Sequence, residues 1–168
     1  MEENKFRKVE KEDFNDWLPL FEKKEVMHFI GLDQTKSAKE LCQKWFDKVF
    51  YRYENNLGGK NALIHKVTGE FVGQCGLLVQ TVEGEKRLEV GYSILPKFWG
   101  QGYATEAAIR CKEFAFENNY CQNLMSIMHP DNIASEKVAL KNGMTFEKFV
   151  PNYQAEVDPI NVFSIDRI

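Results

Sequence analysis

The segment from Leu88 to Asn119 constrains the fold most, because it joins a strand, a turn with two glycines and a helix. LEVGYSIL is expected to form a strand. ATEAAIRCKEFAFENN has small residues at helical spacing and is expected to form a helix. Gly100 and Gly102 stand where this helix begins. The first N–H groups of a helix have no partner within it, and the helix dipole adds positive charge at this end. Since glycines have no Cβ to block an anion, the segment predicts a phosphate-binding turn.

The same two glycines have a simpler interpretation. A pair of glycines also allows a tight connection between a strand and a helix, and so short a match often occurs by chance. Neither GxxxxGK[ST] nor GxGxxG is present at this place. The glycines alone therefore leave both interpretations open.

The spacing of apolar residues predicts the other elements. Strands are expected at 5–9, 62–67, 71–79, 88–95, 124–128, 144–150 and 161–168, and helices at 14–21, 37–53, 104–119 and 132–142. Ser37 and Glu40 form a capping box at the start of a helix, and Gly143 ends the last one. The strands on either side of helix 104–119 should be parallel, because a helical crossover joins them. This order predicts an α+β, or mixed α/β, fold with an antiparallel meander before the crossover.

Composition limits the possible partners. The chain has 168 residues, of which 43% are hydrophobic and 28% charged, as expected of one domain spanning residues 1–168. A net charge of −3 without a long basic run disfavours a nucleic-acid partner. The charged start and the lack of any apolar run near ~20 residues disfavour a signal peptide and a membrane span. The cysteines form no CxxC pair, so reduced thiols and a cytoplasmic location are expected; they are Cys42, Cys75, Cys111 and Cys121.

The sequence does not predict a metal site. His28, His65 and His129 are scattered and show no ligand spacing such as HExxH. No GxSxG motif is present, and no cysteine stands in a pattern typical of a nucleophile. The histidines are expected to be structural or surface groups.

Two longer segments of the sequence indicate a protein family. LEVGYSILPKFWGQGYATEA, at 88–107, and HPDNIASEKVALKNGMTF, at 129–146, closely resemble the GCN5-related N-acetyltransferase (GNAT) superfamily. Within it the likeness is to the RimJ/RimL-like ribosomal-protein N-terminal acetyltransferases. The superfamily pattern [QR]xxGx[GA] falls on Trp99, Gly102 and Ala104, and Trp99 departs from the usual Gln or Arg. The resemblance implies a twisted, mostly antiparallel sheet flanked by about four helices, with one parallel strand pair splayed around the cofactor.

The resemblance also implies acetyl-coenzyme A (acetyl-CoA) and assigns its contacts. The pantetheine chain would run beside Ile94 and Leu95, and Asn132 would contact its amide groups. The turn at the start of the helix would hold the pyrophosphate. Its expected contacts are Gly100, Gln101, Gly102, Tyr103, Ala104 and Thr105. Trp99 is also expected to contact the cofactor. Asn132 has an equally plain interpretation as a helix N-cap.

Acetyl transfer to an amine needs a neutral nucleophile and a stabilised leaving thiolate. Glu89, on the strand before the glycine turn, is the candidate base, although a charge on the surface of a strand would explain it equally well. Ser135 is a candidate hydrogen-bond donor to the leaving thiolate and a candidate contact of the cofactor. The alternative interpretation is that it is only a hydroxyl in the first turn of the helix. Many superfamily members place a tyrosine acid on the last helix, where this chain has Ala139. That difference favours Ser135 over a tyrosine acid.

These observations predict an acetyl-CoA-dependent N-acetyltransferase that acts by direct transfer in a ternary complex, as a monomer or homodimer. The first choice of acetyl acceptor is the α-amine of a protein N-terminus. The alternatives are a small amine, such as a polyamine, an amino acid or an aminoglycoside, and an acyl-CoA-binding module without transferase activity. Contacts with the acetyl acceptor are expected from the early helical segment 23–31 and from 150–161.

Overall fold

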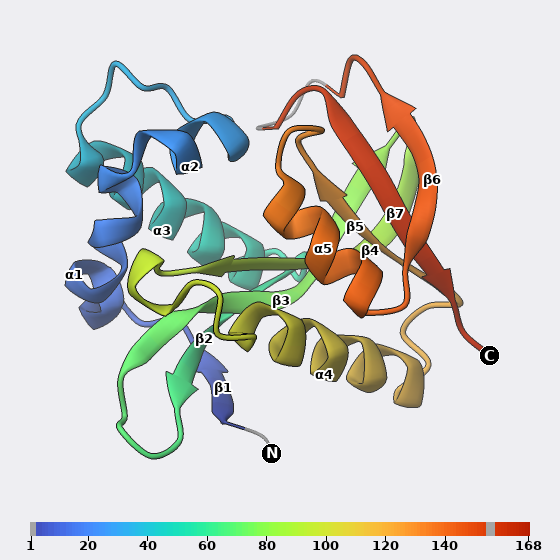
Figure 1. Ribbon diagram of the computed structural model, residues 1–168, viewed down its shortest axis with the longest axis horizontal. Helices are drawn as coiled ribbons and strands as arrows, with labels where there is room; N and C mark the ends of the chain where they lie inside the picture. The colour runs from blue at the N-terminus through green and yellow to red at the C-terminus, as the bar shows by residue number, and fades with distance from the viewer. Residues whose placement is uncertain (1–2, 154–156) are drawn as a thin grey trace.

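The strands form one sheet in a computed structural model that describes residues 3–153 and 157–168 (Figure 1). Within these residues the sheet has seven strands in the order β1-β2-β3-β4-β5-β7-β6. They are β1 (Asn4–Lys8), β2 (Gly58–His65), β3 (Phe71–Val82), β4 (Glu85–Ile94), β5 (Asn123–Met128), β6 (Thr145–Val150) and β7 (Ile160–Asp166). Neighbours in this order run antiparallel, whereas β4 and β5 run parallel. The mixed α/β fold and its parallel pair are thus confirmed.

Helices cover both faces of this sheet. They are α1 (Phe14–Trp17), α2 (Lys24–Phe29), α3 (Ala38–Glu54), α4 (Tyr103–Glu117) and α5 (Ile133–Lys141). The helix predicted at 14–21 is α1 followed by a 3₁₀ helix, Leu18–Glu22, with Pro19 near its start, where the missing N–H breaks no hydrogen bond. The capping box of α3 is confirmed, because Ser37 Oγ accepts from Glu40 N at 3.2 Å and Glu40 Oε2 accepts from Ser37 N at 2.8 Å.

Helices α3 and α4 lie on opposite faces of the sheet. Trp45 of α3 donates through Nε1 to Gln74 Oε1 at 2.9 Å, and the Sγ atoms of Cys75 and Cys111 of α4 lie 3.6 Å apart. Gln74 and Cys75 are neighbours on β3, so their side chains point to opposite faces. Helix α5 contacts α4 and shares its face (Figure 1). The two sides are called the α3 face and the α4 face below.

The parallel strands separate soon after they meet. Strand β4 pairs with β5 at Leu88 and Glu89 only, although both strands continue for several residues beyond these pairs. At the start of the opening, Ser126 Oγ of β5 donates to the carbonyl oxygen of Val90 on β4 at 3.0 Å. In Figure 1 the sheet divides here into two arms, one with β1 to β4 and the other with β5 to β7. An opening in the sheet therefore follows directly after Glu89.

Local sequence signals set the ends and the packing of the helices around this opening. The small side chains of Ala107, Ala108 and Ala115 are fully buried, and they allow α4 to lie close to β3 and β4. Gly143 follows the last helix with φ +84°, a conformation that favours glycine and confirms its role as a C-terminal cap. Among the described residues no helix has the length and apolar character that crossing a membrane requires.

Candidate active site

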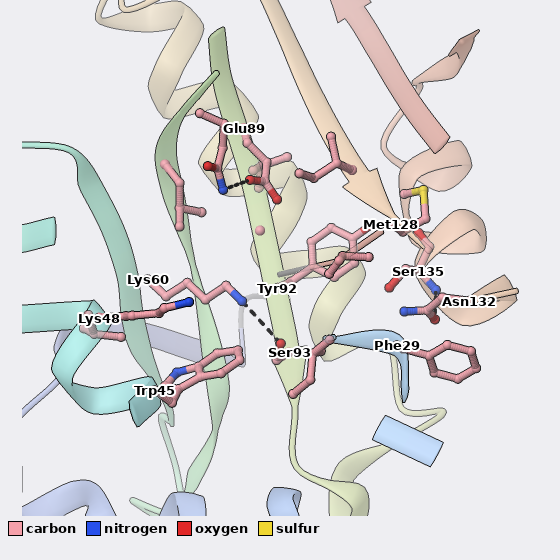
Figure 2. Close-up of a pocket in the computed structure, with 18 of the residues that line it drawn as sticks. Phe29, Trp45, Lys48, Lys60, Glu89, Tyr92, Ser93, Met128, Asn132 and Ser135 are labelled. Carbon is pink, nitrogen blue, oxygen red and sulfur yellow. Dashed lines mark hydrogen bonds between the residues drawn. The ribbon is translucent and has the colours of Figure 1, made fainter. Parts of the chain in front are cut away.

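A cavity of about 190 Å³ lies at the opening between β4 and β5 (Figure 2). Strand β4 contributes residues 89–93 to its wall, and β5 contributes Ile127 and Met128. Ser135 of α5 and Asn132, which caps this helix, also line it, and side chains of α3, β2 and β3 complete the wall on the α3 face. The cavity is therefore lined from both faces of the sheet, so two ligands could enter from opposite sides and meet inside it.

The two segments expected to contact the acetyl acceptor both reach this cavity. Phe29 and Ile30, from 23–31, and Tyr153 and Val157, from 150–161, belong to its wall. Residues 154–156 of the second segment lie outside the described residues. The location of the two segments fits the expected role in binding the acceptor, which stays a prediction.

The glycine turn lies beyond the end of β4, outside the cavity wall. Gly100 and Gly102 have φ values of +73° and +87°, and a Cβ at either position would meet open space rather than protein. In the described part of the chain, the backbone N–H groups from Gly100 to Thr105 have no hydrogen-bond acceptor. The segment also begins α4, whose dipole is positive at this end. This arrangement fits an anionic ligand such as a pyrophosphate, with Gln101, Tyr103 and Ala104 in the same turn.

The end of β4 offers fewer free backbone groups than the sequence predicts. Leu95 N donates to Val72 O at 3.0 Å, and Leu95 O accepts from Phe98 N at 2.9 Å. Ile94 O accepts from Trp99 Nε1 at 2.7 Å. Because alternate residues of a strand face opposite edges, the backbone N–H of Ile94 is directed to the opening while Leu95 is bonded to β3. Ile94 is thus placed to bind an extended ligand through its N–H, whereas Trp99 holds this strand end in position.

Asn132 and Ser135 lie together on the wall that faces β4 (Figure 2). Asn132 Oδ1 accepts from Ser135 N at 3.2 Å, so Asn132 is the N-cap of α5. This bond leaves the amide nitrogen of Asn132 for a ligand. The backbone oxygen of Ser135 accepts from Tyr92 Oη at 2.7 Å, which ties β4 to α5 across the opening. Ser135 Oγ is not needed for either bond, so the hydroxyl can serve a ligand.

Glu89 is a buried carboxylate, not a charge on the surface of the strand. Its side chain faces the cavity, and Glu89 Oε2 accepts from Gln80 Nε2 at 2.8 Å. Gln80 Oε1 in turn accepts from Arg52 at 3.1 Å, and Arg52 also donates to two backbone oxygens. Burial raises the pKa of Glu89, and the Gln80 bond and the charges of Lys60 and Arg52 oppose this shift. A carboxylate with a raised pKa in a cavity is suited to take up a proton.

Lys60 is a cavity residue that the sequence analysis missed. Its ammonium lies 4.4 Å from the centroid of the Trp45 ring and 3.4 Å from Ser93 Oγ (Figure 2). A Cβ at Gly91 would come within 3.1 Å of Lys60 Cε and within 3.4 Å of Glu89 Oε1, so this glycine leaves room between the two groups. The glycine in strand LEVGYSIL was the available signal, because a glycine inside a strand often marks the close approach of another group.

The fold also brings together groups that the sequence analysis regarded as scattered. His28 of α2 lies near His129 and Asp131 of the β5–α5 loop, and one ligand atom from each lies within 4.8 Å of the others. His129 Nδ1 accepts from Asp131 N at 3.1 Å, which leaves Nε2 as its possible ligand atom. His28 and Asp131 are exposed. This group stands at the edge of the cavity beside Phe29 and does not contribute to its wall.

Comparisons with known proteins agree with this geometry. The sequence matches the family described as acetyltransferase (GNAT) domain over residues 5–145. The protein YkkB of Bacillus subtilis (strain 168) is 33% identical over 142 residues, which cover 82% of this chain and 78% of YkkB. The N-acetyltransferase YoaA of the same organism is 24% identical over 95% of this chain and 90% of its own length.

A similar fold is found among solved structures. The ribosomal L7/L12 alpha-N-protein acetyltransferase RimL, in complex with coenzyme A, superimposes with a TM-score of 0.78. The similarity covers 99% of this chain and 95% of RimL, with 14% sequence identity. At this identity the comparison supports the fold and does not transfer the substrate of RimL to this chain.

Proposed function

This chain belongs to the acetyltransferase (GNAT) domain family. We propose that it transfers an acetyl group to the α-amine of a protein N-terminus, with an α-amino acid as the rival acceptor. As a member of this family it is an acetyltransferase with acetyl-CoA as the acetyl donor. The observation that carries the proposal is the cavity at the opening after Glu89, which has walls from both faces of the sheet. It allows donor and acceptor to be bound at the same time.

The residues of this chain fit the donor along a continuous path. The free N–H groups of the turn from Gly100 to Thr105 would hold its pyrophosphate, and the backbone of Ile94 would bind the pantetheine chain. Asn132 would bind an amide group of the pantetheine chain. From there the chain would continue to Ser135 inside the cavity. When bound, acetyl-CoA supplies a thioester whose acetyl group can be attacked by an amine. The glycine turn and the cavity thus act as two parts of one site.

Glu89 is the proposed general base. Acetyl transfer forms a bond from the amine nitrogen to the acetyl carbon, breaks the carbon–sulfur bond and releases one proton from the nitrogen. Glu89 would accept this proton directly or through a water molecule. The bond from Gln80, itself held by Arg52, keeps the carboxylate in place. The hydroxyl of Ser135 would donate a hydrogen bond to the leaving thiolate.

Direct transfer is supported by the positions of the cysteines. A covalent acetyl-enzyme would need a nucleophile in the cavity, and none of the cysteines among the described residues is in its wall. The cavity instead has walls from both faces of the sheet. A ternary complex of donor, acceptor and enzyme therefore agrees best with this geometry.

An α-amine suits this cavity better than a polyamine does. Arg52 and Lys60 line it, and Glu89 is the acidic residue in the described part of its wall. Positive charge disfavours a second ammonium group and favours an amine that is neutral when it binds. The α-amine of a peptide has a pKa of about 7.7 to 8.0 and is roughly a tenth neutral at pH 7, whereas an alkylamine near 10.4 is almost entirely charged. A protein N-terminus is the first choice and an α-amino acid is the rival.

Calorimetry followed by thiol release tests the proposed function. The protein would be titrated with acetyl-CoA, and free thiol would then be measured on adding peptides with different N-termini, amino acids and a polyamine. We expect binding of acetyl-CoA and thiol release that depends on the peptides or amino acids. Release with the polyamine alone would refute an α-amine acceptor, and a lack of acetyl-CoA binding would refute the assignment of the glycine turn.

The domain organisation and the cellular location of the protein are also proposals, and each rests on a separate observation. One continuous sheet supports a single domain over residues 1–168. The four cysteines are free thiols, which supports a reducing, cytoplasmic compartment.

A further inference from the structure

Lys60 extends across the sheet toward the reaction site from two strands away. Lys60 on β2 is opposite Gly76 on β3, which is opposite Gly91 on β4, so these residues form one row. The side chain of Lys60 runs along this row on the α3 face, over strand positions that have no side chain. A Cβ at Gly91 would be within 3.1 Å of Lys60 Cε. Two glycines thus create the space through which the lysine reaches the cavity.

Lys60 is partly buried, and its ammonium has no ionic partner in the described part of the chain. Its contacts are the face of the Trp45 ring and, at 3.4 Å, the hydroxyl oxygen of Ser93. Within residues 3–153 and 157–168, no carboxylate forms a salt bridge with it. An ammonium has three hydrogen-bond donors, so at least two lack a protein acceptor here. A partly buried ammonium with unsatisfied donors is costly to the fold, and an anion would reduce this cost.

The neighbouring charged groups do not supply that anion. Glu89 accepts from Gln80 through Oε2, and its charge favours the ammonium of Lys60, but the two side chains form no salt bridge. Arg52 donates to the backbone oxygens of Leu57 and Val79, and it is a second cation in the same wall. Among the described residues named here, two cations, Lys60 and Arg52, thus accompany one carboxylate, Glu89, on this side of the cavity. An anionic group on the ligand would balance the remaining positive charge.

We propose that Lys60, Ser93 and the Trp45 ring form a subsite that binds a carboxylate of the acetyl acceptor. The inference rests on the proposed function and specifies its substrate class: an α-amine with a carboxylate group close to it. Lys60 would bind this carboxylate by charge, Ser93 would donate a hydrogen bond to it, and Trp45 would exclude water from the pair. With its carboxylate held there, the amine can point along β4 toward Glu89. Lys60 is then a residue that determines specificity.

Two kinds of acceptor carry this group. A free α-amino acid has its own α-carboxylate, and a polypeptide can have an acidic side chain next to its N-terminal amine. Matched pairs of acceptors separate the two sources. Serine is compared with serinamide, and the peptide amide Ser-Asp-NH₂ with Ser-Asn-NH₂, so that each pair differs chiefly in one charge.

The first measurement is kcat/KM for each acceptor with acetyl-CoA in excess. A charged hydrogen bond lost from an enclosed site reduces affinity by about 10-fold to 100-fold. We expect the carboxylate member of at least one pair to be preferred by such a factor, and the Lys60→Met variant to lose this preference. Lys148→Met is the control, because Lys148 pairs with Glu83 outside the cavity wall. The control should keep the preference.

The second measurement does not depend on turnover. Calorimetry of the protein saturated with coenzyme A would compare binding of the acetylated product of each acceptor, for example N-acetylserine against N-acetylserinamide. Tighter binding of a carboxylate product to the wild-type chain, lost in Lys60→Met, supports the subsite even if the acetylation assay finds no turnover. Equal binding within both pairs, or a preference that survives in Lys60→Met, would overturn it. Preference in one pair alone identifies the source of the carboxylate.

Discussion

The Nζ atom of Lys60 lies 4.4 Å from the centroid of the Trp45 ring, so a cation from β2 is covered by an indole from α3. The contact is favourable, but it replaces the water that would otherwise solvate the ammonium. Burial is the main cause that lowers the pKa of Lys60 to about 8, while Glu89 opposes the shift and Arg52 adds to it. The site thus holds its cation at a cost in stability, as residues kept for function often do.

Replacing Lys60 should therefore stabilise the fold. Lysine in an unfolded chain has a pKa of about 10.4, so between about pH 8 and 10.4 the unfolded chain binds more protons than the folded one. Stability then rises with pH across this window, and the full cost of the charge is present below it. We expect Lys60→Met to raise the free energy of unfolding by about 1 to 3 kcal/mol at pH 7. Urea unfolding at pH 7 and pH 10 measures the difference, which should shrink at the higher pH.

Lys148→Met is again the matched control for stability. Lys148 forms an exposed ion pair with Glu83, and removing such a pair changes stability by less than about 1 kcal/mol. The control should therefore unfold nearly as the wild type does at both pH values. If Lys60→Met were less stable than the wild type at pH 7, the ammonium would not be a net cost to the fold.

The glycine turn offers a test that separates ligand binding from backbone strain. Gly102 and Gly84 both have positive φ, +87° and +80°, and a Cβ at either would meet no protein atom. Alanine at each position should therefore cost similar stability, about 1 kcal/mol. Only Gly102→Ala should also weaken acetyl-CoA binding, by about 10-fold or more, because its Cβ enters the space in front of the N–H groups. Calorimetry checks this, and an equal loss in both variants would argue against the pyrophosphate site.

The proposed catalytic residues can be replaced without disturbing their surroundings. Ser135→Ala keeps the backbone bonds to Asn132 and Tyr92, and Glu89→Gln keeps an oxygen that can accept from Gln80. We expect Glu89→Gln to reduce kcat by about 100-fold and the double variant to be slower still, since a general base contributes about that much. A combined loss of less than about 10-fold would contradict both roles.

The dependence of the rate on pH gives a further check on Glu89. Because burial raises the pKa of Glu89, the carboxylate should take up its proton at a higher pH than an exposed glutamate does. A protonated Glu89 cannot act as a base, so kcat/KM should fall as the pH falls through this raised pKa. The part of the acidic limb that comes from Glu89 should be lost in Glu89→Gln, whose profile should keep only the limb of the acceptor amine. An unchanged profile in that variant would assign the limb to another group.

The sequence was sufficient for features that depend on neighbouring residues. The strand, the glycine turn and helix α4 follow one another directly along the chain, so apolar spacing and Gly102 were enough to predict them. The parallel pairing of β4 and β5 also followed, because a crossover helix permits little else. Glu89 and Ser135 were predicted from their positions relative to these elements, and the structure places both in the wall of one cavity.

Features that depend on register and on distant segments were not predicted. Lys60 reaches the cavity because Gly76 and Gly91 fall in its row of the sheet, and strand periodicity does not reveal which residues become opposite. The bond from Tyr92 to the backbone of Ser135 likewise joins residues that are 43 positions apart. Leu95 was expected to lie beside the pantetheine chain, but its N–H donates to Val72 O on β3, a bond that only the register determines.

The histidine group leads to a prediction about metal ions. His28, His129 and Asp131 are close enough to approach one ion, yet the proposed chemistry needs no metal and the group is outside the cavity wall. We expect the rate of acetyl transfer to be unchanged after treatment with EDTA. Loss of activity that returns with an added divalent ion, and that is absent in His28→Ala, would show that this group binds a required metal.

Gly91 should control the acetyl-acceptor side of the cavity without affecting the donor side. A Cβ there would lie 2.9 Å from Leu78 Cδ1 and 3.1 Å from Lys60 Cε, both near the ends of flexible side chains, so the fold should tolerate Gly91→Ala. The added methyl group would displace Lys60 or narrow the passage to Glu89. We therefore expect KM for the acetyl acceptor to rise by about 10-fold, while calorimetry finds the affinity for acetyl-CoA unchanged. Gly69→Ala is a control for effects that come from lost stability alone, because its φ of +73° makes alanine cost about 1 kcal/mol while its Cβ meets no protein atom. Weaker binding of acetyl-CoA to Gly91→Ala would mean that the donor, and not the acceptor, occupies the space beside Lys60.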